Sequence, residues 1–236
     1  MNALKVLGGG AAQGLIASVT PKFEAATGWT IAGDFGAVGT MAARLRGGAA
    51  VDAIVLTAAL VDALKTEGIV VPDSIRPVGS VETCVAVRAR DAVAPIADVG
   101  VLSQTLLMAD AIFVPDTVAS TAGAHVMKVL QQLGIVDRVA GRLKVFPNGA
   151  TAMRSLAASD AARPVGLTQA TEIIATSGLQ LAGALPGEFA LSTIYTAAIT
   201  MRAADAIIAQ SFVDLLADRE QAPLRARAGF LEPSRD

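Results

Sequence analysis

The chain contains few of the residues on which redox, stacking or histidine chemistry depends: one cysteine, one histidine, one tryptophan and one tyrosine among 236 residues. A single cysteine excludes a disulfide framework. Because Cys84 lies in an apolar run, we expect it to be a small buried hydrophobic residue. The scarcity of aromatic rings, a net charge of −2 and the absence of any Lys/Arg run predict that nucleic acid is not a partner.

Long apolar runs are also missing, although hydrophobic residues make up 53% of the chain and the mean hydropathy is +0.55. Polar residues such as Asp52 and Asp214 interrupt each apolar stretch. None reaches the roughly 20 residues that a membrane-spanning helix needs. We therefore predict no membrane span and assign the apolar residues to a buried core.

The first residues do not resemble a secretory signal, because Gly8, Gly9 and Gly10 interrupt the apolar stretch that follows Lys5. They fit a first strand and turn instead. We expect a cytoplasmic protein if Met1 is the native start, and a periplasmic one if a signal peptide has been removed.

Short apolar runs alternate with segments of helical periodicity, which predicts an α/β fold with a parallel sheet. The first helix has Leu15, Ile16, Val19 and Phe23 on one face, and the last has Ile207, Ile208, Phe212, Leu215 and Leu216. The predicted strands are residues 4–7, 29–35, 53–56, 80–88, 112–115, 143–146 and 164–167. The predicted helices between them are residues 40–46, 58–66, 102–108, 123–133, 149–156 and 168–176.

Two longer strand-like segments, residues 80–88 and 189–200, are explained by a middle lobe inserted into the first lobe. We predict lobe 1 from residues 1–83 and 191–236, and lobe 2 from residues 84–190. The two segments would then be the crossings between lobes and the hinge.

The junctions between strands and helices consist of small residues, so backbone N–H groups can approach a ligand there. Helix N-termini attract anions, and ligands of open α/β sheets bind at the carboxyl ends of the strands. We therefore predict a cleft for a small anion between the lobes, although each junction alone is also an ordinary turn with a helix cap. The predicted ligand-binding residues are Gly10, Ala11, Val38, Gly39, Thr40, Thr57, Ser120, Thr121, Ala122, Gly149, Ala150, Thr168 and Gln169.

Cofactor motifs are not evident. Gly8-Gly9-Gly10 with Gly14 meets the spacing of a dinucleotide fingerprint only loosely, and Asp34 is a weak candidate for its acidic residue. We predict no cofactor and no metal site.

Four segments in order resemble the molybdate-binding branch of the type II periplasmic solute-binding proteins. They read LKVLGGGAAQGLIASVTPKFEAATGW, FGAVGTMAARLRGGAAVDAIVLTA, KVLQQLGIVDRV and RPVGLTQATEI, and together they span nearly the whole chain. The resemblance implies a two-lobed α/β periplasmic-binding-protein-like fold with a ligand cleft between the lobes. If the protein is exported, it also implies an ABC transporter permease as partner.

The same resemblance bears on the ligand, because molybdate-binding members use two serine hydroxyls and a tyrosine. By our alignment these fall at Ala11, at Val38 or Gly39, and at Gln169, while backbone donors fall at Ala122 and at Gly149 or Ala150. The side-chain donors are therefore missing and the backbone donors remain. Backbone donors suit a carboxylate as well as an oxyanion, so we expect weak molybdate binding.

Aconitate isomerase resembles the same binding proteins, so the resemblance also implies an enzyme as the alternative. An allylic proton shift needs a base, an acid and carboxylate clamps. The candidate catalytic residues are His125, Tyr195 and Asp116, and Arg154 and Arg202 are candidate clamps. Each has a structural alternative: a structural histidine, a packed tyrosine, a turn-forming aspartate or solvated arginines. The sequence leaves open a binding protein for a small anion and a cytoplasmic isomerase of an unsaturated polycarboxylate.

Overall fold

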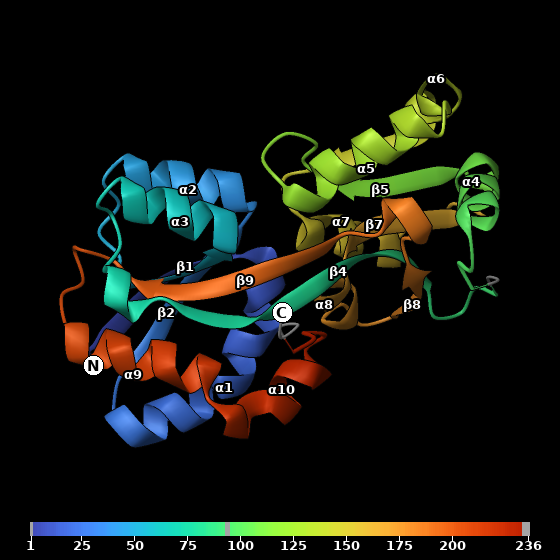
Figure 1. The fold of residues 1–236 in the computed structure, drawn as a ribbon. Coiled ribbons are helices and arrows are strands. Elements are labelled where there is room, and N and C mark those ends of the chain that lie inside the picture. The colour runs from blue at the N-terminus through green and yellow to red at the C-terminus, as the bar shows by residue number, and fades with distance from the viewer. Residues whose placement is uncertain (1, 93–94, 233–236) are drawn as a thin grey trace. The chain divides into compact units, whose positions relative to one another are not determined.

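The computed structural model describes residues 2–92 and 95–232. The chain forms two compact units, which we call unit 1 (Met1–Val81 and Thr193–Asp236) and unit 2 (Glu82–Ser192). Both are α/β structures in which helices follow strands along the chain (Figure 1).

Unit 1 is built on four strands in the order β2, β1, β3, β9. Strands β1 (Ala3–Gly9), β2 (Thr30–Gly36) and β3 (Ala53–Thr57) are parallel, and β9 (Ser192–Ile199) runs antiparallel to β3. The register pairs Thr57 with Tyr195 and Ala53 with Ile199. The carboxyl ends of the three parallel strands therefore lie at one edge of the sheet, beside Tyr195.

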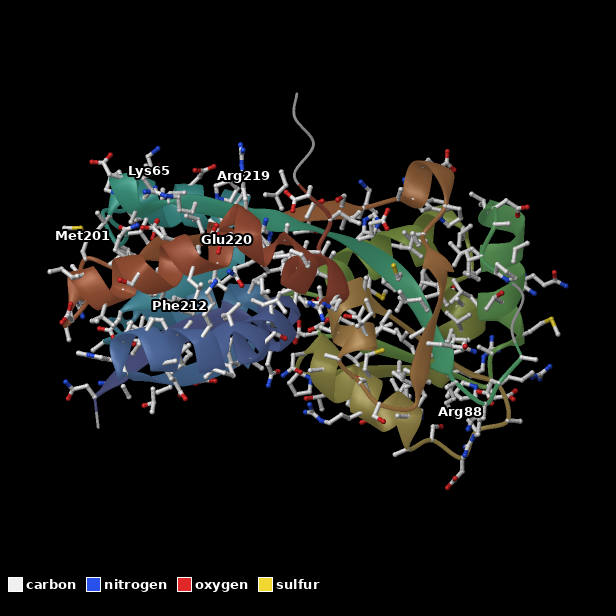
Figure 2. The ribbon with its side chains drawn as sticks, turned by 90° about the horizontal axis from the view of Figure 1, so that it is seen from below. Lys65, Arg88, Met201, Phe212, Arg219 and Glu220 are labelled. Atoms are coloured by element: carbon white, nitrogen blue, oxygen red, sulfur yellow. The ribbon has the colours of Figure 1, made fainter. Side chains whose placement is uncertain are left out.

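Helices of unit 1 cover both faces of its strands, with α2 (Val38–Arg46) and α3 (Ala58–Thr66) on one side in Figure 1. On the other side lie α1 (Gln13–Thr27), which the 3-10 turn Gly10–Ala12 precedes, and α9 (Ala206–Ala217). Phe212 of α9 (labelled in Figure 2) meets Phe23 of α1 edge to face, with ring centroids 5.8 Å apart. Gly28 ends α1 in the left-handed conformation, φ 72°, that glycine adopts most readily.

The remainder of unit 1 consists of short turns and a last helix, α10 (Ala222–Arg227), with the 3-10 turns Pro72–Ser74 and Arg219–Gln221. Asp52, which is 5% exposed, accepts hydrogen bonds from the backbone N–H groups of Lys5 and Ala204, both at 2.7 Å. These bonds satisfy a buried carboxylate at the amino end of β3, and they fasten three distant parts of unit 1 together.

Unit 2 contains the strand order β8, β4, β7, β5, β6. Strands β5 (Ala111–Pro115), β6 (Leu143–Phe146) and β7 (Pro164–Gln169) are parallel, and β4 (Arg76–Arg88) pairs antiparallel with β7 and with β8 (Leu179–Ala184). The chain passes from unit 1 into unit 2 within β4 and returns at β9.

The helices of unit 2 enclose a second core of Val, Leu and Ile side chains. They are α4 (Val99–Met108), α5 (Thr121–Gln132), α6 (Val136–Val139), α7 (Gly149–Ala157) and α8 (Ala170–Ile174), with 3-10 turns at Ala140–Arg142 and Gly187–Phe189. At the end of β4, the guanidinium of Arg88 binds the Asp91 carboxylate and the Ser159 carbonyl, which ties this strand to the loop after α7 (Figure 2).

Several predictions are confirmed: the order of strands and helices up to α7, apart from the short helix α6, which was not predicted, and the buried face of α1. Others are wrong. The sheets are mixed, and β8 was not predicted. Thr168 and Gln169 belong to β7, so the helix begins at Ala170 and not at residue 168. Ile207 is 80% exposed because Asp205 caps α9 and places it in the first turn. No helix in the described ranges is long and apolar enough to cross a membrane.

Candidate functional site

The predicted ligand-binding residues of unit 1 all lie where a helix begins, at the carboxyl edge of the parallel strands. Gly10 and Ala11 form the turn that leads into α1. Val38, Gly39 and Thr40 are the first three residues of α2, and Thr57 is the residue before α3. The backbone N–H groups of a first helical turn have no partner within the helix. This edge therefore presents donors from three helices.

The residues that precede α1, α2 and α3, namely Ala12, Ala37 and Thr57, make no side-chain hydrogen bond that caps the helix. In α2 the residue before the helix is Ala37, which has no polar side chain, and the preceding turn of α1 contains Gly10, Ala11 and Ala12. The residues before the three helices thus supply no anion to the positive ends of the helix dipoles, and their small side chains leave space around the backbone. An anion held here would gain hydrogen bonds and a favourable dipole field.

Tyr195 adds a hydroxyl group to the same edge. Its ring packs on Gly9, the last residue of β1: a Cβ atom added at Gly9 would lie 2.9 Å from Cε1 and 3.4 Å from the hydroxyl oxygen of Tyr195, and 2.6 Å from Cγ1 of Val38. The tyrosine is 3% exposed and meets Phe230 edge to face at 6.1 Å. The structure therefore brings Tyr195 together with the first two predicted anion loops, at the place where the family's serine hydroxyls are missing.

In unit 2 the loop before α5 is shaped by Asp116. Its Oδ1 atom accepts hydrogen bonds from the N–H groups of Val118 at 2.8 Å and Ala119 at 2.7 Å, and these two bonds lower the pKa of the Asp116 carboxyl. Ser120 caps α5 by accepting from the Gly123 N–H at 3.4 Å. Gly123 is required there, because a Cβ atom would overlap the Asp116 carbonyl oxygen. Asp116 is thus a carboxylate that organises the predicted loop around Ser120.

The two remaining predicted loops of unit 2 meet around a carboxyl group that the sequence analysis did not single out, that of Glu172. Thr168 donates its hydroxyl hydrogen to Oε2 of Glu172 at 2.5 Å, and the backbone N–H groups of Ala150 and Gln169 also donate to this carboxyl. The side chain lies so close over Gly149 that a Cβ atom there would overlap Oε2. Burial raises the pKa of Glu172, and the three hydrogen bonds oppose that rise.

His125 lies in the second turn of α5, because the helix begins at Thr121 and not at Gly123 as predicted. It is half-buried, and its Nε2 atom is 2.8 Å from the carbonyl oxygen of Phe189. A carbonyl oxygen only accepts, so Nε2 carries the hydrogen and Nδ1 is the nitrogen left to take a proton. The ring joins α5 to the turn that ends at Phe189.

The two candidate arginine clamps lie differently. Arg154 is exposed on α7 and donates to the Thr151 hydroxyl at 3.1 Å. Arg202 donates to the Gly48 carbonyl at 2.8 Å and lines a hollow of about 170 Å³. Arg202 lies just after Ile199, which pairs with Ala53, the first residue of β3. The carboxyl edge of unit 1 is at the other end of that strand, at Thr57. The length of β3, about 13 Å, therefore separates Arg202 from the carboxyl edge of unit 1.

Two further groups bear on chemistry. Cys84 is 3% exposed, and burial raises the pKa of its thiol to about 12, so the thiolate that reacts is scarce at neutral pH. Within residues 2–92 and 95–232, no three His, Cys, Asp or Glu side chains gather in a way that suits a metal ion. The groups available for chemistry are backbone donors and Tyr195 in unit 1, and backbone donors, Glu172, Asp116 and His125 in unit 2.

The sequence and the structure are similar to those of known proteins. The bacterial extracellular solute-binding protein family matches residues 4–231. An aconitate isomerase from Pseudomonas sp. is 25% identical over 230 residues, which is 93% of this chain and 84% of that protein. The periplasmic molybdate-binding protein of Azotobacter vinelandii has a similar structure, with a TM-score of 0.82, 18% identity, and coverage of 98% of this chain and 100% of that one.

The sulfate-binding protein SubI of Mycobacterium tuberculosis is similar too, with a TM-score of 0.74, 17% identity, and coverage of 98% of this chain and 86% of that one. These structural likenesses cover 98% of the chain, so the type II periplasmic-binding-protein-like fold predicted from the sequence is confirmed. The family match covers nearly the entire chain, and the protein belongs to the bacterial extracellular solute-binding protein family.

Proposed function

We propose that the protein binds a small carboxylate or oxyanion. The observation that carries this proposal is the carboxyl edge of unit 1, where α1, α2 and α3 begin without a side-chain cap beside the Tyr195 ring. Structurally similar proteins are named for binding molybdate and sulfate. If the protein is exported, an ABC transporter permease would receive the bound ligand.

The donor set favours a carboxylate over molybdate. Ala11 and Val38 have no hydroxyl group, and Gln169 stands where molybdate-binding members have a tyrosine. A hydrogen bond to a charged group contributes about 1.5–3 kcal/mol. Two or three such losses weaken molybdate binding by a few orders of magnitude.

Titration calorimetry with molybdate, tungstate, sulfate and a panel of mono-, di- and tricarboxylates tests this proposal. We expect a carboxylate to bind and molybdate to bind at least 100-fold more weakly, in keeping with the loss of two charge-assisted hydrogen bonds of about 1.5 kcal/mol each. Binding of molybdate tighter than that of every carboxylate would contradict the ligand choice. Failure of all these anions to bind would contradict the proposed function itself.

An isomerase of a small unsaturated polycarboxylate is the second candidate, and the resemblance to aconitate isomerase over 93% of the chain favours it. In the allylic shift a base removes a proton from the methylene carbon, the double bond moves by one carbon, and a proton returns to the former alkene carbon. Tyr195 lies at the unit 1 edge and His125 keeps Nδ1 available, whereas the lowered pKa of Asp116 makes its carboxylate a weak base.

Incubation with trans-aconitate in deuterated water, followed by NMR, tests the isomerase. Deuterium incorporation that Tyr195→Phe or His125→Ala lowers by about 10²–10⁴ would support it, because that is the typical contribution of a general base or acid. We expect Asp116→Asn to change the rate far less. If a carboxylate binds the parent protein but incorporates no deuterium, the isomerase is contradicted and the binding function remains.

A further inference from the structure

Glu172 occupies the position at which the sequence pattern places an anion in unit 2. Four predicted ligand-binding residues, Gly149, Ala150, Thr168 and Gln169, surround its carboxyl group. At α7, the backbone donor that the resemblance assigns to the ligand, at Gly149 or Ala150, is one that Glu172 uses, and Glu172 also accepts from the backbone N–H of Gln169, where the resemblance places a tyrosine side chain. Each backbone N–H group offers one hydrogen. Those of Ala150 and Gln169 are therefore already bonded inside the chain.

An ordinary helix cap does not account for the whole arrangement. The bond from the Gln169 N–H to Glu172 is one half of a capping box, in which the third helical residue reaches back to the residue before the helix. Capping-box glutamates need only their own helix, yet Glu172 of α8 also accepts from the Ala150 N–H in the first turn of α7. It is 8% exposed, so one buried carboxylate holds the starts of two helices together.

We propose that Glu172 is a resident carboxylate that fills the anion-binding position of unit 2 and sets the ligand selectivity of the protein. This inference rests on the proposed function for its selectivity part. A ligand that contacts unit 2 at this position would meet the negative charge of Glu172 there. Because Coulomb repulsion scales with the product of the charges, Glu172 disfavours doubly charged oxyanions more than anions with one charge.

The first experiment tests whether the Glu172 carboxylate fills an anion-binding position, and it does not require the ligand to be known. Glu172→Ala removes the carboxylate and leaves the Thr168 hydroxyl and two N–H groups around a small polar cavity, which formate can fill. We expect formate to raise the Tm of Glu172→Ala by about 2–4 °C above the same concentration of chloride, with saturation, and to leave the parent unchanged. Equal effects of formate and chloride on the variant would overturn the proposal.

The second experiment tests selectivity with a variant that keeps the side-chain volume. Glu172→Gln removes the charge, and Glu188→Gln, which changes an exposed glutamate of the same unit, is the matched control. In calorimetry with molybdate and acetate, we expect Glu172→Gln to raise the affinity for molybdate relative to acetate about tenfold or more, and Glu188→Gln to leave the ratio unchanged.

The two experiments separate the two claims. If formate stabilises Glu172→Ala but Glu172→Gln has the same ratio of molybdate to acetate affinity as the parent, the selectivity role is overturned. The proposal that Glu172 fills the anion-binding position would still hold. If neither molybdate nor acetate binds any variant, the selectivity role between these two anions is overturned. The wider anion panel still tests the proposed function, and formate rescue still tests whether Glu172 fills an anion-binding position. If Glu172→Ala does not fold in chloride, refolding that depends on formate supports the proposal, and failure to refold with formate overturns it.

Discussion

Tyr195 of β9 packs directly on Gly9 at the end of β1, although they are 186 positions apart in the sequence: a Cβ atom added at Gly9 would meet Cε1 of the ring at 2.9 Å. The pairing of β3 with β9 makes this contact, because its register places Tyr195 opposite Thr57, the last residue of β3. The pairing of β3 with β9 thus places the Tyr195 hydroxyl beside the loop Gly10–Ala12, which has no hydroxyl side chain.

Gly9→Ala tests this packing. The new methyl group would overlap Cγ1 of Val38 and the Tyr195 ring, so we expect the free energy of unfolding to fall by about 1–3 kcal/mol. Anion affinity should fall as well, because the ring is pushed from the edge. Gly47→Ala is the control, since Gly47 has a φ of −72° and its added Cβ meets nothing closer than 3.4 Å. Urea unfolding of both variants measures the difference, and equal stabilities would contradict the close packing.

Tyr195→Phe tests the hydroxyl group separately from the ring. The ring contacts with Gly9 and Phe230 remain, so we expect a change in stability below about 1.5 kcal/mol. The affinity for the bound carboxylate should fall by roughly 10- to 100-fold, the value of one hydrogen bond to a charged acceptor. Calorimetry measures the affinity and thermal unfolding the stability. Unchanged affinity would show that the hydroxyl does not reach the ligand.

The sequence was sufficient for most of the fold because short apolar runs and helical periodicity are local signals. Residues 58–66 show both signals and form α3 with the predicted bounds. β8 escaped prediction because it pairs only with β4, is partly exposed and lacks a continuous apolar run. Ile207 was misassigned because periodicity alone does not reveal that Asp205 caps the helix.

The candidate site was predictable in its loops and not in its long-range partners. The small residues at each junction indicated helix beginnings, and the structure places Val38, Thr57 and Gly149 at helix starts. The neighbours of Tyr195 and Glu172 depend on strand register and on contacts between helices, which no local pattern contains. One signal for Glu172 was present: an acidic residue in the first turn of a helix that follows a buried strand.

Asp116→Asn should change the pH dependence of stability. Hydrogen bonds from Ala119 and Val118 lower the pKa of Asp116 in the folded protein, so its contribution to stability is present above the unfolded pKa, near 4, and is lost as pH falls through the folded pKa. We expect the Tm of Asp116→Asn to lie below that of the parent at pH 7 and to converge with it toward pH 3.

Thermal unfolding at intervals between pH 7 and pH 3 measures this convergence. Asp160→Asn, at an exposed position of the same unit, is the control and should follow the parent at every pH. A constant difference between the parent and Asp116→Asn would show that the two backbone bonds do not depend on the charge of the carboxylate.

Gly149→Ala and Glu172→Ala should be strongly coupled. In the single variant Gly149→Ala, the new Cβ atom overlaps the Glu172 carboxyl and the Thr168 hydroxyl, which hydrogen bonds and burial hold in place. We expect this variant to lose roughly 3 kcal/mol or more of stability. Gly141→Ala, where an added Cβ meets nothing within 4 Å, should lose less than about 1 kcal/mol.

In the double variant the carboxylate is gone, so the methyl group of Ala at position 149 occupies space that Glu172 has left. The summed losses of the two single variants should exceed the loss of the double variant by about 1–3 kcal/mol, a coupling typical of residues in contact. Urea unfolding of all four proteins closes this cycle. Additive losses would mean that the Glu172 side chain does not lie over Gly149 in solution, and the resident carboxylate would then lose its structural basis.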